Sequence, residues 1–208
     1  MPRQGLNRRR VLEAALKIVD DGGLADLTMR NLAQQLGIEA PSLYKHVDGK
    51  PDILDGITSL IYEEIEFTGI TGSFRERVLA YGDAFRRALL AHPNAVELLA
   101  MRTLPRESTI DLVETALSEL ANLGFPPTEG RRYVNVAVGF IVGHVLAEVG
   151  SRQLGLEELL AARRQFDDPR YPHARLLALE PVDYDAEFQL GIGLIVDAIE
   201  RKAAALVG

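Results

Sequence analysis

The residues best suited to chemistry lie in one short segment, where hydroxyl, aromatic and cationic side chains follow one another closely. Ser42, Tyr44, Lys45, His46 and Lys50 belong to it. Hydroxyls and cations donate hydrogen bonds to phosphate oxygens and to the edges of bases, so this mixture suits contact with a nucleic acid. The segment is therefore the first candidate for a functional surface.

Catalytic chemistry has fewer residues to draw on, because the chain holds four His and no Cys. His46 lies in the segment above, His92 and His173 fall in predicted loops, and His144 precedes Glu148 by one helical turn. The chain contains no H-E-x-x-H zinc motif, no glycine-rich phosphate loop after a strand and no G-x-S-x-G elbow. We therefore expect neither an enzyme nor a bound metal or cofactor.

Three short helices are predicted to position the candidate segment. Apolar periodicity predicts a first helix from Asn7, a good N-cap, to Gly22, and a second from Thr28 to Gly37. Pro41 suits the first turn of a third helix of about two turns. This is the arrangement of a helix-turn-helix, whose second helix enters the DNA major groove. By spacing alone, a three-helix corner that does not bind DNA is equally open.

Helical periodicity continues through the rest of the chain, and no segment is a strong strand candidate. We predict an all-α fold, with a helix-turn-helix DNA-binding domain in residues 1–50 and a helical ligand-binding and dimerisation bundle in residues 51–208. The further helices are expected at residues 50–67, 73–91, 94–102, 106–123, 128–150, 156–166 and 184–206.

Composition and charge agree with a globular protein whose basic residues gather at one end. The 208 residues are 47% hydrophobic and 25% charged, and the net charge is −7. Residues 1–50 carry eight Lys and Arg against six acids, whereas the remainder carries 15 against 24. The longest apolar run, Val136 to Leu146, falls short of the roughly 20 residues that span a bilayer. With no Cys and no secretory signal, we expect a cytoplasmic protein without a membrane partner.

Several stretches in residues 5 to 60 resemble the DNA-binding domain of the tetracycline repressor (TetR) family. The resemblance implies a dimeric, all-α transcriptional repressor that binds a double-stranded DNA operator and is released by a small molecule. The matching stretches are Gly5-Leu6-Asn7-Arg8, Ala14-Ala15-Leu16, Leu27-Thr28-Met29-Arg30, Leu32-Ala33-Gln34-Gln35-Leu36-Gly37-Ile38-Glu39 and Ser42-Leu43-Tyr44-Lys45-His46-Val47 with Lys50.

The resemblance also implies roles for individual residues on the DNA-binding surface. It places Arg30 within reach of guanine and Thr28 near a phosphate, and it assigns Lys50 to a backbone phosphate. Two positions depart from the family pattern: Ala40 replaces a glutamine that can read adenine, and Lys45 replaces an aromatic residue. We expect a different operator, because Ala40 offers at most a methyl contact to thymine. The residues on the recognition helix are Ser42, Tyr44, Lys45 and His46.

An effector site is expected in the second domain. Glu66 and Leu99 stand where tetracycline-binding members of the family present histidines to a magnesium-drug complex, so we expect a mostly apolar effector instead. Polar orienting groups would be Arg102, Asn135 and His144. For His144 and for each apolar residue, ordinary core packing is the alternative. The expected apolar lining comprises Phe85, Leu89, Leu98, Met101, Val138 and Phe140.

The helices at 128–150 and 184–206 are apolar on more than one face, as expected for helices that face a second subunit. Glycines within them lower helix propensity but allow two backbones to approach closely. We therefore predict a homodimer, with packing inside one chain as the alternative. A helical protein-interaction module without specific DNA binding is the alternative function. The expected interface residues are Gly139, Gly143, Gly191, Gly193 and Ile195.

Overall fold

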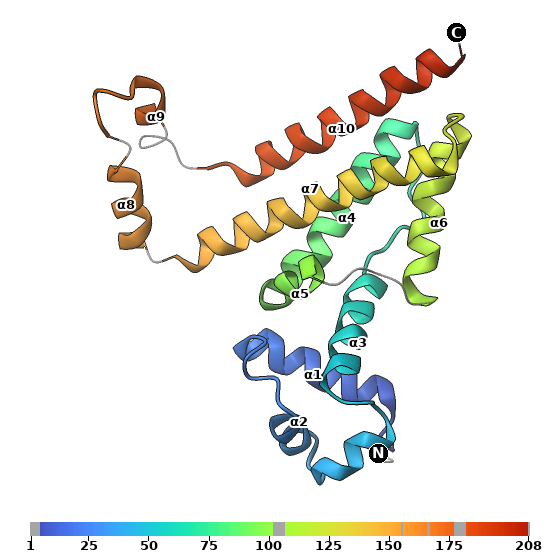
Figure 1. The fold of residues 1–208 in the computed structure, drawn as a ribbon, viewed down its shortest axis with the longest axis vertical. Coiled ribbons are helices and arrows are strands. Elements are labelled where there is room, and N and C mark those ends of the chain that lie inside the picture. The colour runs from blue at the N-terminus through green and yellow to red at the C-terminus, as the bar shows by residue number, and fades with distance from the viewer. Residues whose placement is uncertain (1–4, 102–106, 155, 166, 177–181, 208) are drawn as a thin grey trace.

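The computed structural model describes residues 5–101, 107–154, 156–165, 167–176 and 182–207, and these residues form helices without any strand. The predicted all-α fold is confirmed. Figure 1 shows a small head of α1, α2 and η1 beneath a larger helical body, with α8 and α9 extending beyond one end of α7. The helices are α1 (Arg8–Gly22), α2 (Met29–Leu36), the 3₁₀ helix η1 (Ala40–Lys45), α3 (Lys50–Glu63), α4 (Phe74–Ala91), the 3₁₀ turn η2 (Pro93–Ala95), α5 (Val96–Met101), α6 (Glu107–Asn122), α7 (Pro127–Gln153), α8 (Leu156–Arg164), α9 (Pro172–Leu176) and α10 (Tyr184–Val207).

The first two helices begin and end at the residues that their sequence predicts. The Asn7 side chain accepts a hydrogen bond from the Arg10 N–H at 2.9 Å, and the Thr28 hydroxyl accepts one from the Asn31 N–H at 3.0 Å. Gly37 ends α2 in the left-handed conformation, with φ of 66°, which glycine adopts without the strain of a Cβ atom. These caps fix the turn that leads into η1.

Two helices differ from their predicted form. The recognition helix is a 3₁₀ helix of six residues rather than an α-helix of two turns. Runs of 3₁₀ helix longer than about three to four residues are uncommon in proteins. Buried Leu43 and Val47 anchor this one in the head. Helix α3 ends at Glu63 rather than at residue 67, since its last amides bond three residues back, from Glu64 to Ile61. The short helix α9 was not predicted.

Helix α3 joins the head to the body. It packs against α1 on the head side and against α4, α5 and α6 on the body side. Gly56 lets α1 and α3 approach closely, because a Cβ atom there would lie 2.3 Å from the Leu12 Cδ2 atom. A movement of α3 therefore involves both parts of the chain. The domain boundary at residue 50 stays a prediction.

In the body, α7 and α10 lie side by side and antiparallel, with α4 packed against both (Figure 1). A Cβ atom on Gly191 would lie 2.1 Å from the Phe140 ring, and one on Gly82 would lie 3.2 Å from Ile192. Gly191 thus serves contact between α7 and α10 of one chain, where the Phe140 ring fills the space, and its role in a dimer interface stays a prediction.

Helix α7 is unusually long and apolar. By length and composition alone it is, among the described residues, a helix that could cross a membrane, a test that the core helix of a soluble protein also meets. In the fold it packs against α4, α5, α6 and α10, and only 28% of its most apolar window is buried. Much of its apolar surface is therefore left uncovered in the single chain.

Candidate DNA-binding face and effector pocket

The predicted DNA-contacting cations lie on the outer surface of the head. Arg30, Lys45 and Lys50 are exposed, and the Tyr44 ring is 58% exposed although its neighbour Leu43 is fully buried. η1 therefore presents its polar side outward while Leu43 anchors it.

The smaller predicted residues are less open. The Thr28 hydroxyl caps α2 as an acceptor, which leaves its hydrogen available for a phosphate. Ser42 and His46 are half-buried, and Ala40 packs against the hydrophobic core of the head. The Ala40 methyl is therefore only partly available to a thymine, because part of it faces Leu43 and its neighbours inside the head.

A cluster that the sequence did not indicate holds the end of η1. Arg8 donates to both oxygens of Asp52, at 2.6 and 2.8 Å, and to the carbonyl oxygen of His46 at 3.2 Å. Asp52 also accepts the Asp48 N–H at 3.0 Å. These bonds tie α1, η1 and α3 together behind the exposed residues.

A second polar cluster connects the head to the body. The His92 ring lies between two carboxylates, with Nδ1 at 3.0 Å from Asp20 and Nε2 at 2.9 Å from Glu64. Asn94 donates to the Asp20 carbonyl oxygen at 2.9 Å. Burial lowers the pKa of His92, but its hydrogen bonds with Glu64 and Asp20 outweigh burial and raise the pKa above its ordinary value.

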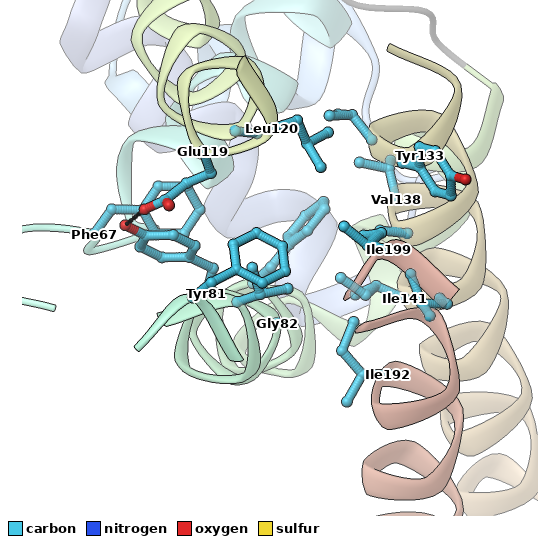
Figure 2. A pocket seen from close by; sticks show the side chains of 17 residues that line it. Phe67, Tyr81, Gly82, Glu119, Leu120, Tyr133, Val138, Ile141, Ile192 and Ile199 are labelled. Atoms are coloured by element: carbon cyan, nitrogen blue, oxygen red, sulfur yellow. Dashed lines mark hydrogen bonds between the residues drawn. The ribbon is translucent and has the colours of Figure 1, made fainter. Parts of the chain in front are cut away.

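The body contains an apolar pocket with a cavity volume of about 120 Å³ between α4, α6, α7 and α10. Five aromatic rings contribute to its wall, and most of the remainder is aliphatic, from all four helices (Figure 2). An apolar cavity of about 150 Å³ can bind a small apolar molecule such as benzene. The five rings belong to Phe67, Phe74, Tyr81, Phe85 and Tyr133.

Glu119 is the charged residue that lines this pocket within the described parts of the chain. Its carboxylate accepts from Arg77 Nε at 2.7 Å and also from Arg77 Nη2, and the Tyr81 hydroxyl donates to it at 3.2 Å. The hydrogen bond from Arg77 holds the Glu119 pKa below its ordinary value despite burial. Figure 2 shows Glu119 and Tyr81 at the Phe67 end of the pocket, away from Tyr133.

The pocket overlaps only partly with the predicted one. Phe85 and Val138 line it, whereas Leu89 and Leu98 are buried elsewhere in the core. Met101 is corrected: its side chain is 73% exposed and so cannot line an enclosed apolar cavity. Asn135 is exposed as well, and Arg102 lies outside the described residues.

His144 and its neighbours have contact partners within the chain. His144 Nε2 lies 2.9 Å from the Tyr184 carbonyl oxygen rather than against Glu148. Glu148, 1% exposed, accepts instead from Arg86 Nη2 at 2.8 Å. Phe140 stacks on Phe188 at 5.7 Å between ring centroids. These contacts are the core packing that we had kept as the alternative.

Glu66 and Leu99, which stand where the family pattern has metal-linked histidines, both lie outside the pocket. Glu66 is exposed and Leu99 is 5% exposed, and neither lines the pocket. Within the described residues, no group of three or more His, Cys, Asp or Glu side chains could hold a metal ion.

One predicted interface position is turned inward, while three glycines face open space. Ile195 lines the pocket, and its placement at the interface stays a prediction. A Cβ atom on Gly139, Gly143 or Gly193 would meet nothing within 4 Å. Exposed apolar side chains of the same two helices are Val136 at 58%, Leu190 at 64% and Leu194 at 57%.

Comparisons with known proteins agree with this architecture. A model described as "Bacterial regulatory proteins, tetR family" matches residues 11–57, and one described as "Tetracyclin repressor-like, C-terminal domain" matches residues 69–203. The class D tetracycline repressor protein of Escherichia coli is 30% identical, over 97% of this chain and 93% of that protein. Apo ActR from Streptomyces coelicolor has a TM-score of 0.85 at 24% identity, over 99% of this chain and 100% of that one.

A second ActR structure, in complex with actinorhodin, has a TM-score of 0.82 at 26% identity, over 93% of this chain and 95% of that one. The two model matches account for both the head and the body. The chain therefore belongs to the tetR family of bacterial regulatory proteins and is a ligand-responsive, DNA-binding transcriptional regulator.

Proposed function

We propose that the chain is a cytoplasmic repressor that binds a palindromic operator as a homodimer, and that a small, mostly apolar molecule entering the pocket releases it. The observation that carries the proposal is the exposed polar face of η1 on a head that α3 connects to an apolar pocket. We assign it no catalytic step.

The DNA-binding part of the proposal divides the head residues by role. Lys50 and Thr28 would contact phosphates, which position the head, whereas Arg30 would contact base edges, which carry sequence information. Tyr44 and Lys45 would lie in the major groove with η1. A two-fold dimer then presents two copies of this face about 34 to 36 Å apart, one turn of DNA.

The dimer would form through the exposed faces of α7 and α10. Their apolar residues and open glycines allow helices from two subunits to pack closely, as in a four-helix interface. Such an interface is isologous, so each patch meets its own copy.

The release step would act through α3, which packs against α6, the helix that carries Glu119, while Phe67 follows α3 in the chain. A guest that contacts both α6 and Phe67 would favour one position of α3. To move the equilibrium from 1:99 to 99:1, the guest must bind one state about 10⁴-fold more tightly than the other. The relative ActR is described in complex with actinorhodin, which supports a pocket-bound effector here.

The DNA-binding test starts by selecting an operator from a random duplex library and measuring affinity against salt concentration. Lys50→Ala should weaken every sequence alike and reduce the salt slope by about one. Arg30→Ala should instead lose about 1 to 3 kcal/mol of preference at one base pair. Arg201→Ala, which removes an exposed cation from α10, serves as the matched control.

Two results would reject this placement of the DNA face. One is that both head variants keep the affinity and salt slope of the wild type. The other is that the library returns no enriched sequence, which would favour a helical protein-interaction module instead.

A further inference from the structure

We propose that protonated His92 is a positioning residue that fixes the head relative to the body, so that affinity for the operator falls as the pH rises. The inference rests on the proposed function for its DNA target, and it names a regulation of that binding. It follows from the place where three helices end, from the two carboxylates around the imidazole ring and from the contact of α1 with η2.

His92 lies where the ends of three helices meet. It follows α4 of the body directly, whereas Asp20 belongs to the last turn of α1 and Glu64 follows α3 directly. The ring is within hydrogen-bond distance of both carboxylates, at 3.0 Å from Asp20 and 2.9 Å from Glu64. The C-terminal end of a helix carries partial negative charge, which favours a cation. One ring therefore links the head, the connecting helix and the body.

The protonation state of the ring decides whether both contacts attract. An imidazolium donates a hydrogen bond from each nitrogen, so it can bind Asp20 and Glu64 together. A neutral ring donates from one nitrogen only, and the lone pair of the other nitrogen would then face a carboxylate oxygen. The His92 side chain is 12% exposed, so water screens these contacts little. Loss of the proton therefore removes one of the two links.

The charged groups around this cluster leave His92 as the one that changes state near neutral pH. Among the described residues, Asp20 and Glu64 are the charged groups that shift the His92 pKa, against an opposing effect of burial. Arg87 on α4 and Glu97 on α5 are exposed, and η2 carries no charged side chain. Carboxylates, Lys and Arg ordinarily titrate far from neutral pH, whereas His does not. The other charged groups beside the cluster on α1 and α3 pair with one another, Arg9 with Glu13 and Glu63, and Lys17 with Asp21.

The contact between head and body also includes apolar packing that does not depend on pH. α1 packs against η2, the 3₁₀ turn directly after His92, and Ala95 and Val96 are fully buried in a core that the head and the body share. Loss of the proton should therefore widen the range of head positions rather than separate the head from the body. In a two-fold dimer both heads must fit half-sites of fixed spacing, so a wider range lowers operator affinity.

The first test measures the position of the head without DNA. The chain has no Cys, so Gln35→Cys on α2 and Arg87→Cys on α4 place one spin label on the head and one on the body, both at exposed positions. Labelled chains diluted into unlabelled chains report distances within one chain by pulsed electron paramagnetic resonance. We expect a narrower distance distribution at pH 6 than at pH 9. When His92→Gln is added, the distribution should be broad at both pH values.

The second test compares affinity for the selected operator with affinity for scrambled DNA, from pH 6 to 9 at constant ionic strength. The wild-type ratio should be about tenfold above that of His92→Gln at pH 6, a size typical of coupling between sites, and equal to it at pH 9. His92→Arg keeps the charge and the donors at every pH, so its ratio should stay about tenfold above that of His92→Gln throughout. Titration of His46 on the head is common to all three proteins and cancels in the comparison.

Two carboxylate variants tie the pH dependence to this cluster. Glu64→Gln removes the negative charge beside the ring, so the midpoint of the wild-type transition should move to lower pH. Glu63→Gln is the matched control, because Glu63 is the neighbouring acid and pairs with Arg9 instead of His92. The control should keep the midpoint of the wild type.

The outcomes separate this inference from the proposed function. A distance distribution of the same width at pH 6 and pH 9, or a His92→Gln ratio equal to that of the wild type at pH 6, would overturn the inference while operator binding still stands. A wild-type ratio that rises with pH relative to His92→Gln would also overturn it. If the library yields no operator, the proposed function fails, and the distance measurement still decides whether His92 fixes the head.

Discussion

Arg8 in α1 donates two hydrogen bonds to Asp52 in α3, at 2.6 and 2.8 Å, and a third to the carbonyl oxygen of His46, the residue that follows η1. Asp52 is 14% exposed, so water screens this pair less than an open surface pair. The pair fixes the end of η1 relative to α1 and α3. We therefore expect the angle at which η1 would meet DNA to depend on Asp52, a residue whose negative charge suits no phosphate contact.

Asp52→Asn should reduce discrimination rather than overall attraction to DNA. The change removes a charged partner of Arg8 and loosens η1, while no cation is lost from the DNA face. We expect the ratio of operator affinity to scrambled-DNA affinity to fall about tenfold, and affinity for scrambled DNA to stay the same or rise. Fluorescence anisotropy with both duplexes measures the ratio.

Glu13→Gln is the control for this prediction, because Glu13 pairs with Arg9 on the surface, where both side chains are more than half exposed and an ion pair contributes little. It should leave the ratio unchanged. An equal loss on operator and scrambled DNA in Asp52→Asn would contradict the positioning role.

The His92 cluster predicts a pH dependence of stability. Both ring nitrogens lie within hydrogen-bond distance of carboxylates, an arrangement that favours the protonated ring, in which both nitrogens donate. A group whose pKa is raised by folding stabilises the folded state fully below its unfolded pKa, and this stabilisation disappears as the pH rises through the folded pKa. The free-energy difference of unfolding between wild type and His92→Gln should therefore shrink as the pH rises above 6.5, the ordinary value.

Urea unfolding between pH 5 and 9 measures this difference. His173→Gln on α9 is the control, since His173 is exposed and its replacement should give a difference that does not vary with pH. A His92→Gln difference that stays constant across the range would mean that the contacts with Asp20 and Glu64 add no net stabilisation.

The sequence predicted the fold well because helical periodicity and caps are local. Asn7, Thr28 and Gly37 each act on neighbouring amides, and their roles are confirmed. η1 differed because its form depends on how Leu43 and Val47 anchor it in the head, which is a tertiary effect.

The pocket was harder to predict because helical periodicity does not say which helices meet. Val138 was assigned to it, but Met101 projects into solvent. A usable signal was present in α4, where Phe74, Tyr81 and Phe85 recur at helical spacing and define one aromatic face. Glu119 could not be found this way, since its role depends on Arg77 from another helix.

Gly143→Glu should convert the protein to monomers and abolish operator binding. A side chain at Gly143 meets nothing inside the chain, so the monomer should fold normally, as far-UV circular dichroism would show. In an isologous interface both subunits carry the substitution, so the two added carboxylates would face and repel each other across the two-fold axis. Sedimentation velocity measures the mass.

Ala121→Glu, an equal change at an exposed position of α6, should leave the dimer intact. A Gly143→Glu protein that sediments as a dimer would move the interface away from α7.

Val138→Phe should separate effector response from DNA binding. Val138 lines the pocket on α7, so a larger ring there takes up space that the effector needs, while the head lies elsewhere and keeps its operator affinity. Some overpacking is expected, at about 1 to 3 kcal/mol of stability. The effector concentration that half-releases the operator should therefore rise at least tenfold in Val138→Phe. Ala121→Phe is the matched control, because Ala121 is exposed on α6 and does not line the pocket. Equal release from wild type and Val138→Phe would place the effector site outside this pocket, and release by micromolar magnesium-tetracycline would contradict our reading of Glu66 and Leu99.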